Sequence, residues 1–266
     1  MPHDPTDNPD QALAVVRGSH APPDAPAQRI WVLIPCAGLG TRAASALPKQ
    51  YRVVAGRAVV EHTLAAFAGV PGLAPALVLL APGDTQFAAL ESEHAAGCRA
   101  VACGGPTRAA TVANGLAELR ACGALATDWV MVHDAARCLV TSELILRLID
   151  ACRHDAVGGL LAVPVADTVK RAADGRALVT VDRALHWLAQ TPQMFRLGEL
   201  WRALQVAGES VTDESSAIEA LGLAPRLVVG DQSNFKLTVA QDFAMAQAIL
   251  LARGKGRPKE RNYDYP

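Results

Sequence analysis

A glycine-rich segment in the first part of the chain holds the residues best suited to bind phosphate. The segment PCAGLGTR at 35–42 directly follows an apolar run at 30–34. Glycine lets backbone N–H groups approach an anion closely, and a helix that begins after such a turn adds its positive N-terminal end. Arg42 and Lys49 supply two cations beside the turn, as the charge of a triphosphate requires. The spacing therefore predicts a nucleotide-phosphate site.

Two common phosphate-binding motifs do not fit this segment. A dinucleotide-binding fingerprint places a third glycine where Ala43 stands, and it needs an acidic residue at the end of a second strand, which is not evident. A P-loop needs Gly-Lys-Ser or Gly-Lys-Thr, whereas Gly40 is followed by Thr41 and Arg42. The glycine turn therefore indicates a different class of phosphate site.

Asp134 is the acidic residue best placed to join this turn. It follows the apolar run at 129–132, so its carboxylate falls at the carboxyl end of a predicted strand. In parallel α/β sheets the carboxyl ends of the strands form the ligand crevice, and the glycine turn lies at the same edge. The alternative interpretation of Asp134 is a cap of a helix or turn.

Short apolar runs that alternate with helical patterns predict the scaffold. The runs at 30–34, 77–80, 129–132 and 160–163 lack polar alternation, as strands covered on both faces do. Helical patterns lie at about 58–69, 107–121, 142–154, 197–207, 213–221 and 239–252. The alternation predicts an α/β fold with a Rossmann-like, mostly parallel sheet and flanking helices.

One segment interrupts that alternation. Strand-like runs at 167–170 and 177–181 flank Asp174-Gly175, a dipeptide typical of tight hairpin turns. We expect a projecting β-arm at about 167–185, with an ordinary surface hairpin as the alternative. The domain is expected at 29–252, after a disordered leader at 1–28 that is rich in Pro, Asp and Ala, and before a flexible basic tail at 253–266.

The overall composition limits the possible partners. The 266 residues include 25 basic and 26 acidic side chains and carry a formal net charge of -1, which favours no nucleic-acid partner. No apolar run reaches the roughly 20 residues of a membrane span, and no signal pattern opens the chain. Among the six cysteines no Cys-x-x-Cys pair occurs. We therefore expect a cytoplasmic protein with no membrane partner.

A series of short motifs runs through the chain in a fixed order. They are PCAGLGTR at 35–42, PKQY at 48–51, Gly104-Gly105 with Arg108 and Thr111, HDAAR at 133–137, 164–170, VDR at 181–183, TPQ at 191–193, TDE at 212–214 and NFK at 234–236. This series resembles the 2-C-methyl-D-erythritol 4-phosphate cytidylyltransferase family over about residues 30–252. Cys36, Pro106 and Cys138 depart from the family pattern, but none of them removes a charge from the expected site.

The resemblance implies a role for each matching residue. Those that act in catalysis are Arg42 and Lys49, which hold the triphosphate, and Lys236, a phosphate contact near the metal. Those that surround CTP are Ala37, Gly38, Gly40, Gly105, Arg108, Thr111 and Asp134, with the backbone near Gly105 reading the pyrimidine edge. Those that contact the sugar phosphate are Arg137, Thr168, Arg183, Thr191 and Thr212. Asp134 is implied to be the Mg²⁺-associated carboxylate, since Mg²⁺ is held by one or two carboxylates with phosphates and water.

The resemblance further implies transfer of CMP from CTP to 2-C-methyl-D-erythritol 4-phosphate, with release of pyrophosphate, in non-mevalonate isoprenoid biosynthesis. It also implies a homodimer joined through the β-arm, with Arg183 reaching the neighbouring subunit. His133 is interpreted as structural, because the attacking phosphate is already anionic and needs no strong base. With few residues after position 252, we expect no fused cyclase domain.

Three alternative functions stay open. Ribitol 5-phosphate cytidylyltransferases have much the same motifs, and the sequence does not separate the two polyols. A non-catalytic CTP-sensing module would not need Arg42, Lys49 and Asp134 together. A hydride-transferring Rossmann enzyme is disfavoured by the incomplete glycine fingerprint.

Overall fold

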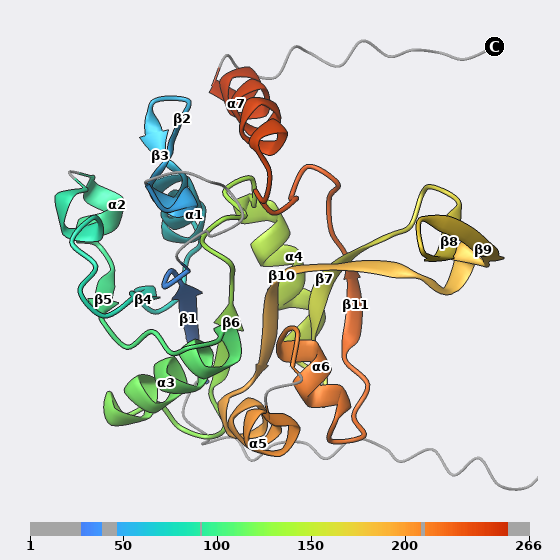
Figure 1. Ribbon diagram of the computed structural model, residues 1–266. Coiled ribbons are helices and arrows are strands. Elements are labelled where there is room, and N and C mark those ends of the chain that lie inside the picture. The colour runs from blue at the N-terminus through green and yellow to red at the C-terminus, as the bar shows by residue number, and fades with distance from the viewer. Residues whose placement is uncertain (1–27, 39–46, 91, 209–210, 255–266) are drawn as a thin grey trace, which may run out of the picture.

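The computed structural model describes residues 28–38, 47–90, 92–208 and 211–254, and these residues form a sheet with helices on both faces (Figure 1). The seven strands of the main sheet are β1 (Ile30–Pro35), β4 (Leu77–Leu79), β5 (Arg99–Val101), β6 (Trp129–Val132), β7 (Gly158–Pro164), β10 (Trp187–Arg196) and β11 (Arg226–Val229). The α-helices are α1 (Val59–Ala68), α2 (Glu93–Ala96), α3 (Arg108–Ala121), α4 (Ser142–Cys152), α5 (Leu197–Ala207), α6 (Glu214–Glu219) and α7 (Ala240–Gly254).

The sheet has the strand order β11-β7-β10-β6-β1-β4-β5. β1 pairs in parallel with both β4 and β6, β4 with β5, and β7 with β11. β10 runs antiparallel to its neighbours β6 and β7. The predicted Rossmann-like, mostly parallel sheet is confirmed, and the carboxyl ends of β1 and β6 lie side by side at one edge.

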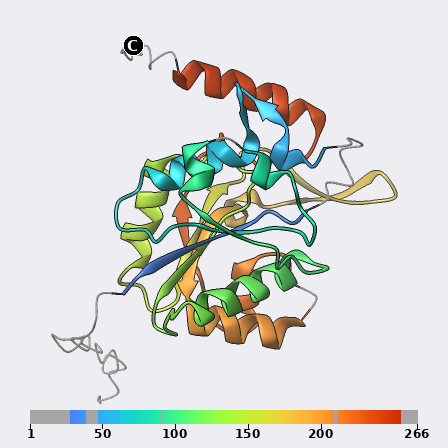
Figure 2. The same ribbon diagram turned by 90° about the vertical axis from the view of Figure 1, so that its left-hand side faces the viewer.

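Strand alternation divides the core between the two faces of the sheet. Val32 and Ile34 of β1 pack with α1 and α4, whereas Leu33 between them packs with α3, α5 and α6. Figure 2, turned by 90°, shows the helices on either side of the sheet. Because both faces are covered, β1, β4 and β6 consist of apolar residues, which explains why their sequences lack polar alternation.

The predicted helices and central strands all form, with boundaries shifted by a few residues. Thr141, for example, caps α4 by accepting a hydrogen bond from the backbone N–H of Leu144 at 3.4 Å. α7 extends through Gly254, two residues beyond its predicted end at 252. Three strands of the sheet were not predicted: β5 and β11 are short and partly exposed, and β10 contains Pro192 and several polar residues.

The predicted arm is present as a separate two-stranded ribbon made of β8 (Val169–Ala173) and β9 (Arg176–Val181). Asp174 and Gly175 at its tip have φ angles of 49° and 73°, as a tight hairpin turn between twisted strands requires. The ribbon extends away from the sheet (Figure 1), and most of its side chains are exposed.

The predicted leader at 1–28 lies outside the described residues except for Gln28, and the tail at 253–266 does so beyond Gly254. A second small ribbon, β2 (Val53–Val54) with β3 (Arg57–Ala58), packs beside α7. Within 28–38, 47–90, 92–208 and 211–254, no helix is long and apolar enough to cross a membrane.

Close packing between β7 and β11 yields a stability prediction. A Cβ atom added at Gly159 would lie 2.3 Å from the carbonyl oxygen of Arg226 and 2.9 Å from its Cβ. The clash cannot be relieved by a change of side-chain rotamer, because the carbonyl oxygen belongs to the backbone of a paired strand. We expect Gly159→Ala to destabilise the protein by about 1–3 kcal/mol, a typical cost of overpacking. Urea unfolding followed by circular dichroism measures this change. Gly254→Ala, at a position with open space, is the control, and equal stability of the two variants would contradict the packing described.

Candidate active site

A cavity of about 450 Å³ opens at the carboxyl edge of the sheet, beside β1, β6 and the start of α3. It lies where an α/β sheet ordinarily binds its ligand. The predicted site residues that line it are Ala37, Gly38, Lys49, Gly105, Arg108, Thr111, Asp134 and Lys236. Residues far apart in the sequence therefore meet in one cavity, as the sequence predicted.

A smaller cavity of about 190 Å³ shares Arg108, Asp134 and Lys236 with the first. Its further predicted members are Arg137, Thr191 and Thr212. The shared residues stand between the two spaces, so groups bound in one cavity would approach groups bound in the other at this point.

Asp134 is the centre of the charged cluster. Its Oδ1 accepts a hydrogen bond from Nε of Arg108 at 2.8 Å, and its Oδ2 lies 2.9 Å from Nζ of Lys236. Nε of Arg137 is 3.7 Å from the same Oδ2. Burial alone would raise the pKa of Asp134, but these three cations hold it well below its usual range. The carboxylate is therefore ionised throughout the physiological pH range.

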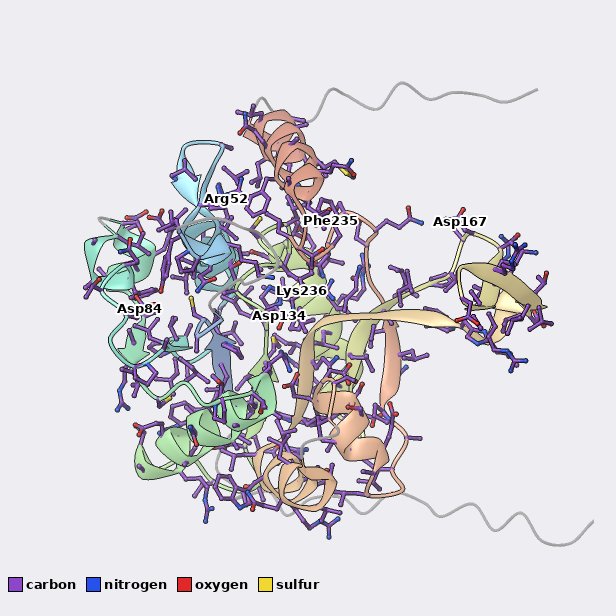
Figure 3. All side chains as sticks on the ribbon, in the orientation of Figure 1. Arg52, Asp84, Asp134, Asp167, Phe235 and Lys236 are labelled. Atoms are coloured by element: carbon purple, nitrogen blue, oxygen red, sulfur yellow. The ribbon has the colours of Figure 1, made fainter. Side chains whose placement is uncertain are left out.

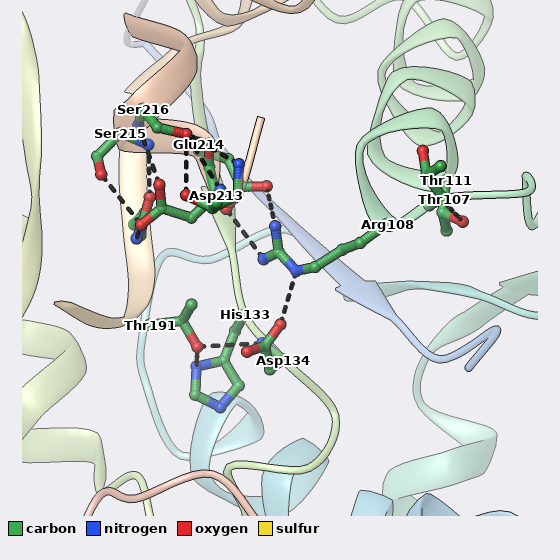
Figure 4. A network of polar contacts seen from close by, with 12 residues as sticks. Thr107, Arg108, Thr111, His133, Asp134, Thr191, Asp213, Glu214, Ser215 and Ser216 are labelled. Carbon is green, nitrogen blue, oxygen red and sulfur yellow. Dashed lines mark hydrogen bonds and ion pairs between the residues drawn. The ribbon is translucent and has the colours of Figure 1, made fainter. Parts of the chain in front are cut away.

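A chain of hydrogen bonds fixes the backbone of Asp134 (Figure 4). The Asp134 N–H donates to Oγ1 of Thr191 at 3.1 Å, and that hydroxyl is 3.0 Å from Nδ1 of His133. Nε2 of His133 is 3.1 Å from the carbonyl oxygen of Arg137. Burial lowers the pKa of His133 to about 3, so the ring is neutral and serves the backbone geometry. This agrees with the structural role expected for His133.

The segment 234–237 (NFKL), here called the lysine strap, contributes Lys236 to the lining of both cavities (Figure 3 labels Phe235 and Lys236). Asn234 donates from Nδ2 to the carbonyl oxygen of Thr191 at 2.9 Å, and its own carbonyl accepts from Nη1 of Arg137 at 2.8 Å. The carbonyl of Leu237 accepts from Nζ of Lys49 at 3.0 Å. The lysine strap therefore positions both predicted lysines. Lys236 is part of the strap, and Lys49 is held by its hydrogen bond to the carbonyl of Leu237.

The turn that contains Gly105, a residue that lines the larger cavity, is closely packed. The Gly105 N–H donates to Oγ1 of Thr111 at 3.0 Å, and the Gly104 N–H donates to the carbonyl of Leu80 at 2.8 Å. A Cβ atom at Gly104 would lie 2.5 Å from that of Ala37. Both N–H groups are therefore engaged within the protein, and the packing leaves no room for a side chain at Gly104.

The cavities do not include every predicted residue. Gly40 and Arg42 lie outside the described residues. Thr168 and Arg183 belong to the arm, where both are exposed, and an Nη of Arg183 donates to the carbonyl of Ala166. Figure 3 shows Asp167, at the base of the arm, well away from Asp134 and Lys236. Within one chain, the structure therefore does not bring Thr168 and Arg183 to the site.

Sequence reasoning missed two residues of the site. Gln50 donates from Nε2 to the carbonyls of Cys36 and Gly38 at 2.9 and 3.0 Å, and so holds the glycine turn. Glu214 forms a bidentate ion pair with Arg108. Both stand next to predicted residues, in PKQY at 48–51 and TDE at 212–214, but a position in a motif does not reveal which way a side chain points.

A glycine-rich motif, a cluster of cations and a buried aspartate at the carboxyl edge of a Rossmann-like sheet are typical of a nucleotidyltransferase. Residues 30–252 match the family described as 2-C-methyl-D-erythritol 4-phosphate cytidylyltransferase. The chain belongs to this family, as its motifs predicted.

Two relatives illustrate the family. A 2-C-methyl-D-erythritol 4-phosphate cytidylyltransferase of Burkholderia cenocepacia is 51% identical over 229 residues, which cover 84% of this chain and 96% of the relative. A bifunctional enzyme IspD/IspF of Albidiferax ferrireducens is 58% identical over 228 residues, or 86% of this chain. The match spans 54% of that bifunctional relative's length.

Solved structures agree with this assignment. A 4-diphosphocytidyl-2C-methyl-D-erythritol synthase is 42% identical with a TM-score of 0.75, and the match covers 85% of this chain and all of that one. The 2-C-methyl-D-erythritol 4-phosphate cytidylyltransferase of Francisella tularensis is 33% identical with a TM-score of 0.70, over 83% and 99% of the two chains.

The buried neutral His133 predicts a pH dependence of stability. Between pH 6.5 and about 3 the unfolded chain binds a proton at this histidine that the folded protein does not bind. The free energy of unfolding therefore decreases as the pH falls through this window, by up to ~1.4 kcal/mol per pH unit from this group. His133→Gln removes the titrating group, so the stability of this variant should depend less steeply on pH.

Urea unfolding at several pH values between 4 and 7 measures that slope. His154→Gln, at an exposed position, is the control for loss of a histidine. If the His133→Gln variant has the same slope as the unmodified protein, the folded protein protonates His133 as readily as the unfolded chain does.

Proposed function

We propose that this protein transfers CMP from CTP to 2-C-methyl-D-erythritol 4-phosphate, giving the CDP-methylerythritol product and pyrophosphate, in isoprenoid biosynthesis. The observation that carries the proposal is the shared wall of the two cavities, where Arg108, Asp134 and Lys236 stand together. CTP is assigned to the larger cavity and the polyol phosphate to the smaller one. Family membership supports this pairing of substrates, and the cytoplasm is the proposed location.

The proposed reaction is a direct displacement. An oxygen of the substrate's phosphate attacks the α-phosphorus of CTP, the bond to the β-phosphate's bridging oxygen breaks, and pyrophosphate leaves. Lys49, bonded to the lysine strap, and Lys236, within it, supply positive charge, and Arg42 is assigned to the triphosphate from the family motif. Catalysis then consists of alignment and charge neutralisation, with no covalent enzyme intermediate.

Arg137 is assigned to the substrate phosphate. Its Nη1 and Nη2 donate to the carbonyls of Asn234 and Ala189, at 2.8 and 3.3 Å. Its buried Nε has no hydrogen-bond partner among the described residues. The guanidinium therefore links the lysine strap to β10 and offers its charge to a bound anion.

Magnesium is part of the proposal. The described residues contain no cluster of three or more metal-ligating side chains, so they do not form an all-protein metal site. Mg²⁺ does not require one, because it commonly takes one or two carboxylates and completes its shell with phosphates and water. The ionised Asp134, which lines both cavities, fits that requirement, and a bound Mg²⁺ would neutralise charge on the triphosphate.

A homodimer joined through the β-arm completes the proposed site. Thr168 and Arg183 are assigned to the substrate but lie on the arm at 167–185, so in the proposed dimer they reach the site of the neighbouring copy. The arm and the adjoining start of β10 also leave Leu178, Leu185 and Leu188 exposed by 61, 85 and 57%. A two-stranded ribbon is marginally stable alone, and exposed apolar surface beside free strand edges favours association. A two-fold dimer uses the same surface on both chains.

The substrate assignment is tested by incubating the protein with CTP, Mg²⁺ and each candidate polyol phosphate while following pyrophosphate release. We expect release with 2-C-methyl-D-erythritol 4-phosphate, and far less when ATP or GTP replaces CTP. Faster turnover with ribitol 5-phosphate would move the assignment to that polyol. Tight CTP binding with no turnover on either polyol would point to a CTP-sensing module.

The shared site is tested by mixing two inactive variants. Arg183→Ala removes the arm residue assigned to the substrate, and Lys49→Ala removes a cation of the cavity. In a mixed dimer, one site then combines an intact cavity with an intact arm from the other subunit. We expect activity to return on mixing, up to about half of the sites in a mixed dimer. Sedimentation of protein lacking 171–176 should show a weaker dimer. If the subunits exchange and no activity returns, Arg183 acts within its own chain.

A further inference from the structure

Glu214 is a buried carboxylate in the site to which the sequence motifs assign no role. Its side chain is 1% exposed, and its two oxygens accept hydrogen bonds from Nη1 and Nη2 of Arg108 at 2.7 and 3.0 Å. The N–H on Nε of that guanidinium donates to Oδ1 of Asp134 at 2.8 Å. Figure 4 shows Arg108 between these two carboxylates. The three residues come from the starts of α3 and α6 and from the end of β6.

The backbone that carries Glu214 is firmly held. Asp213 caps α6 by accepting from the Ser216 N–H at 3.0 Å, and Gln193 of β10 donates to the same aspartate at 2.8 Å. Oε1 of Gln193 accepts from the Ser215 N–H at 2.8 Å. Glu214 therefore projects from a turn fixed on both sides, whereas Arg108 has a long side chain that could adopt many rotamers.

We propose that Glu214 is a positioning residue that holds the Arg108 guanidinium at the wall shared by the two cavities, and that CTP binding depends on this placement. The inference rests on the proposed CTP site. The two parallel hydrogen bonds of a bidentate pair fix the plane of the guanidinium as well as its position. Burial alone would lower the pKa of Arg108, but Glu214 and Asp134 raise it above its ordinary value.

Positioning and simple electrostatics predict opposite results for Glu214→Gln. If only charge mattered, loss of an anion beside the cavity would strengthen the binding of an anionic nucleotide. If Glu214 positions Arg108, its loss weakens binding, because glutamine presents a donor to one of the guanidinium N–H groups and cannot accept both hydrogen bonds. The sign of the change in CTP affinity therefore separates the two roles.

Calorimetric titration of the full chain with CTP and Mg²⁺ measures this affinity without a polyol phosphate. We expect Glu214→Gln to raise the Kd for CTP by about tenfold or more, since hydrogen bonds to charged groups are among the stronger ones. Glu219→Gln, at an exposed position on the same short helix, is the matched control and should bind CTP as the unmodified protein does. Glu214→Asp keeps the charge but moves the carboxylate away from Arg108, because its side chain is shorter. It should raise the Kd for CTP less than Glu214→Gln does, and it replaces that variant as the test if Glu214→Gln fails to fold.

A double-mutant cycle tests whether Glu214 acts through Arg108. Arg108→Ala should weaken CTP binding, and adding Glu214→Gln to it should change the Kd by less than about twofold. An unchanged or lower Kd in Glu214→Gln, or a full additional loss in the double variant, would overturn the proposal. An unaltered Kd in Arg108→Ala would overturn both the positioning role of Glu214 and the place of Arg108 in the CTP site. CTP binding without turnover would instead count against the proposed reaction alone.

Discussion

The buried carboxylate of Asp134 is the interaction on which the rest of the site depends. A carboxylate removed from water is costly unless cations and hydrogen-bond donors surround it. Arg108 and Lys236 meet that requirement directly, and Arg137 adds a third positive charge nearby. These cations come from α3, the lysine strap and the loop after β6. Three separate segments therefore meet at the edge of the sheet, where their cations neutralise the Asp134 carboxylate.

The same cations serve a second purpose in the proposed reaction, because two anionic substrates must approach each other. A site that is already charged and aligned needs little reorganisation when the substrates arrive. The neutral His133 and the hydroxyl of Thr191 fix the Asp134 backbone, and the lysine strap fixes Lys49 and Lys236. Much of the hydrogen bonding near the cavities thus positions charge, in keeping with a mechanism that needs no general base.

The sequence predicted β1, β4, β6 and β7 from apolar runs without polar alternation, which reflect burial on both faces of the sheet. It predicted the arm from Asp174-Gly175, because a tight turn depends on local backbone geometry. It also predicted that Gly38 and Asp134 would meet, since both follow parallel strands. It did not predict β10, whose Pro192 and polar residues are buried by tertiary contacts rather than by an apolar pattern. Nor did it predict Glu214, which a first-turn position in a helix explains equally well. Patterns locate a residue on an element, but they do not show which partner its side chain meets.

We propose that Asp134 organises bound phosphates together with Mg²⁺. The most direct test is how the rate of the Asp134→Asn variant depends on the Mg²⁺ concentration. The substitution keeps the size of the side chain and removes a charged oxygen ligand. Pyrophosphate release is measured across a Mg²⁺ titration at saturating CTP, with circular dichroism to confirm the fold. We expect the variant to need a higher Mg²⁺ concentration for its half-maximal rate. An unchanged half-maximal Mg²⁺ concentration would show that the nucleotide alone holds the metal and that Asp134 is not its ligand.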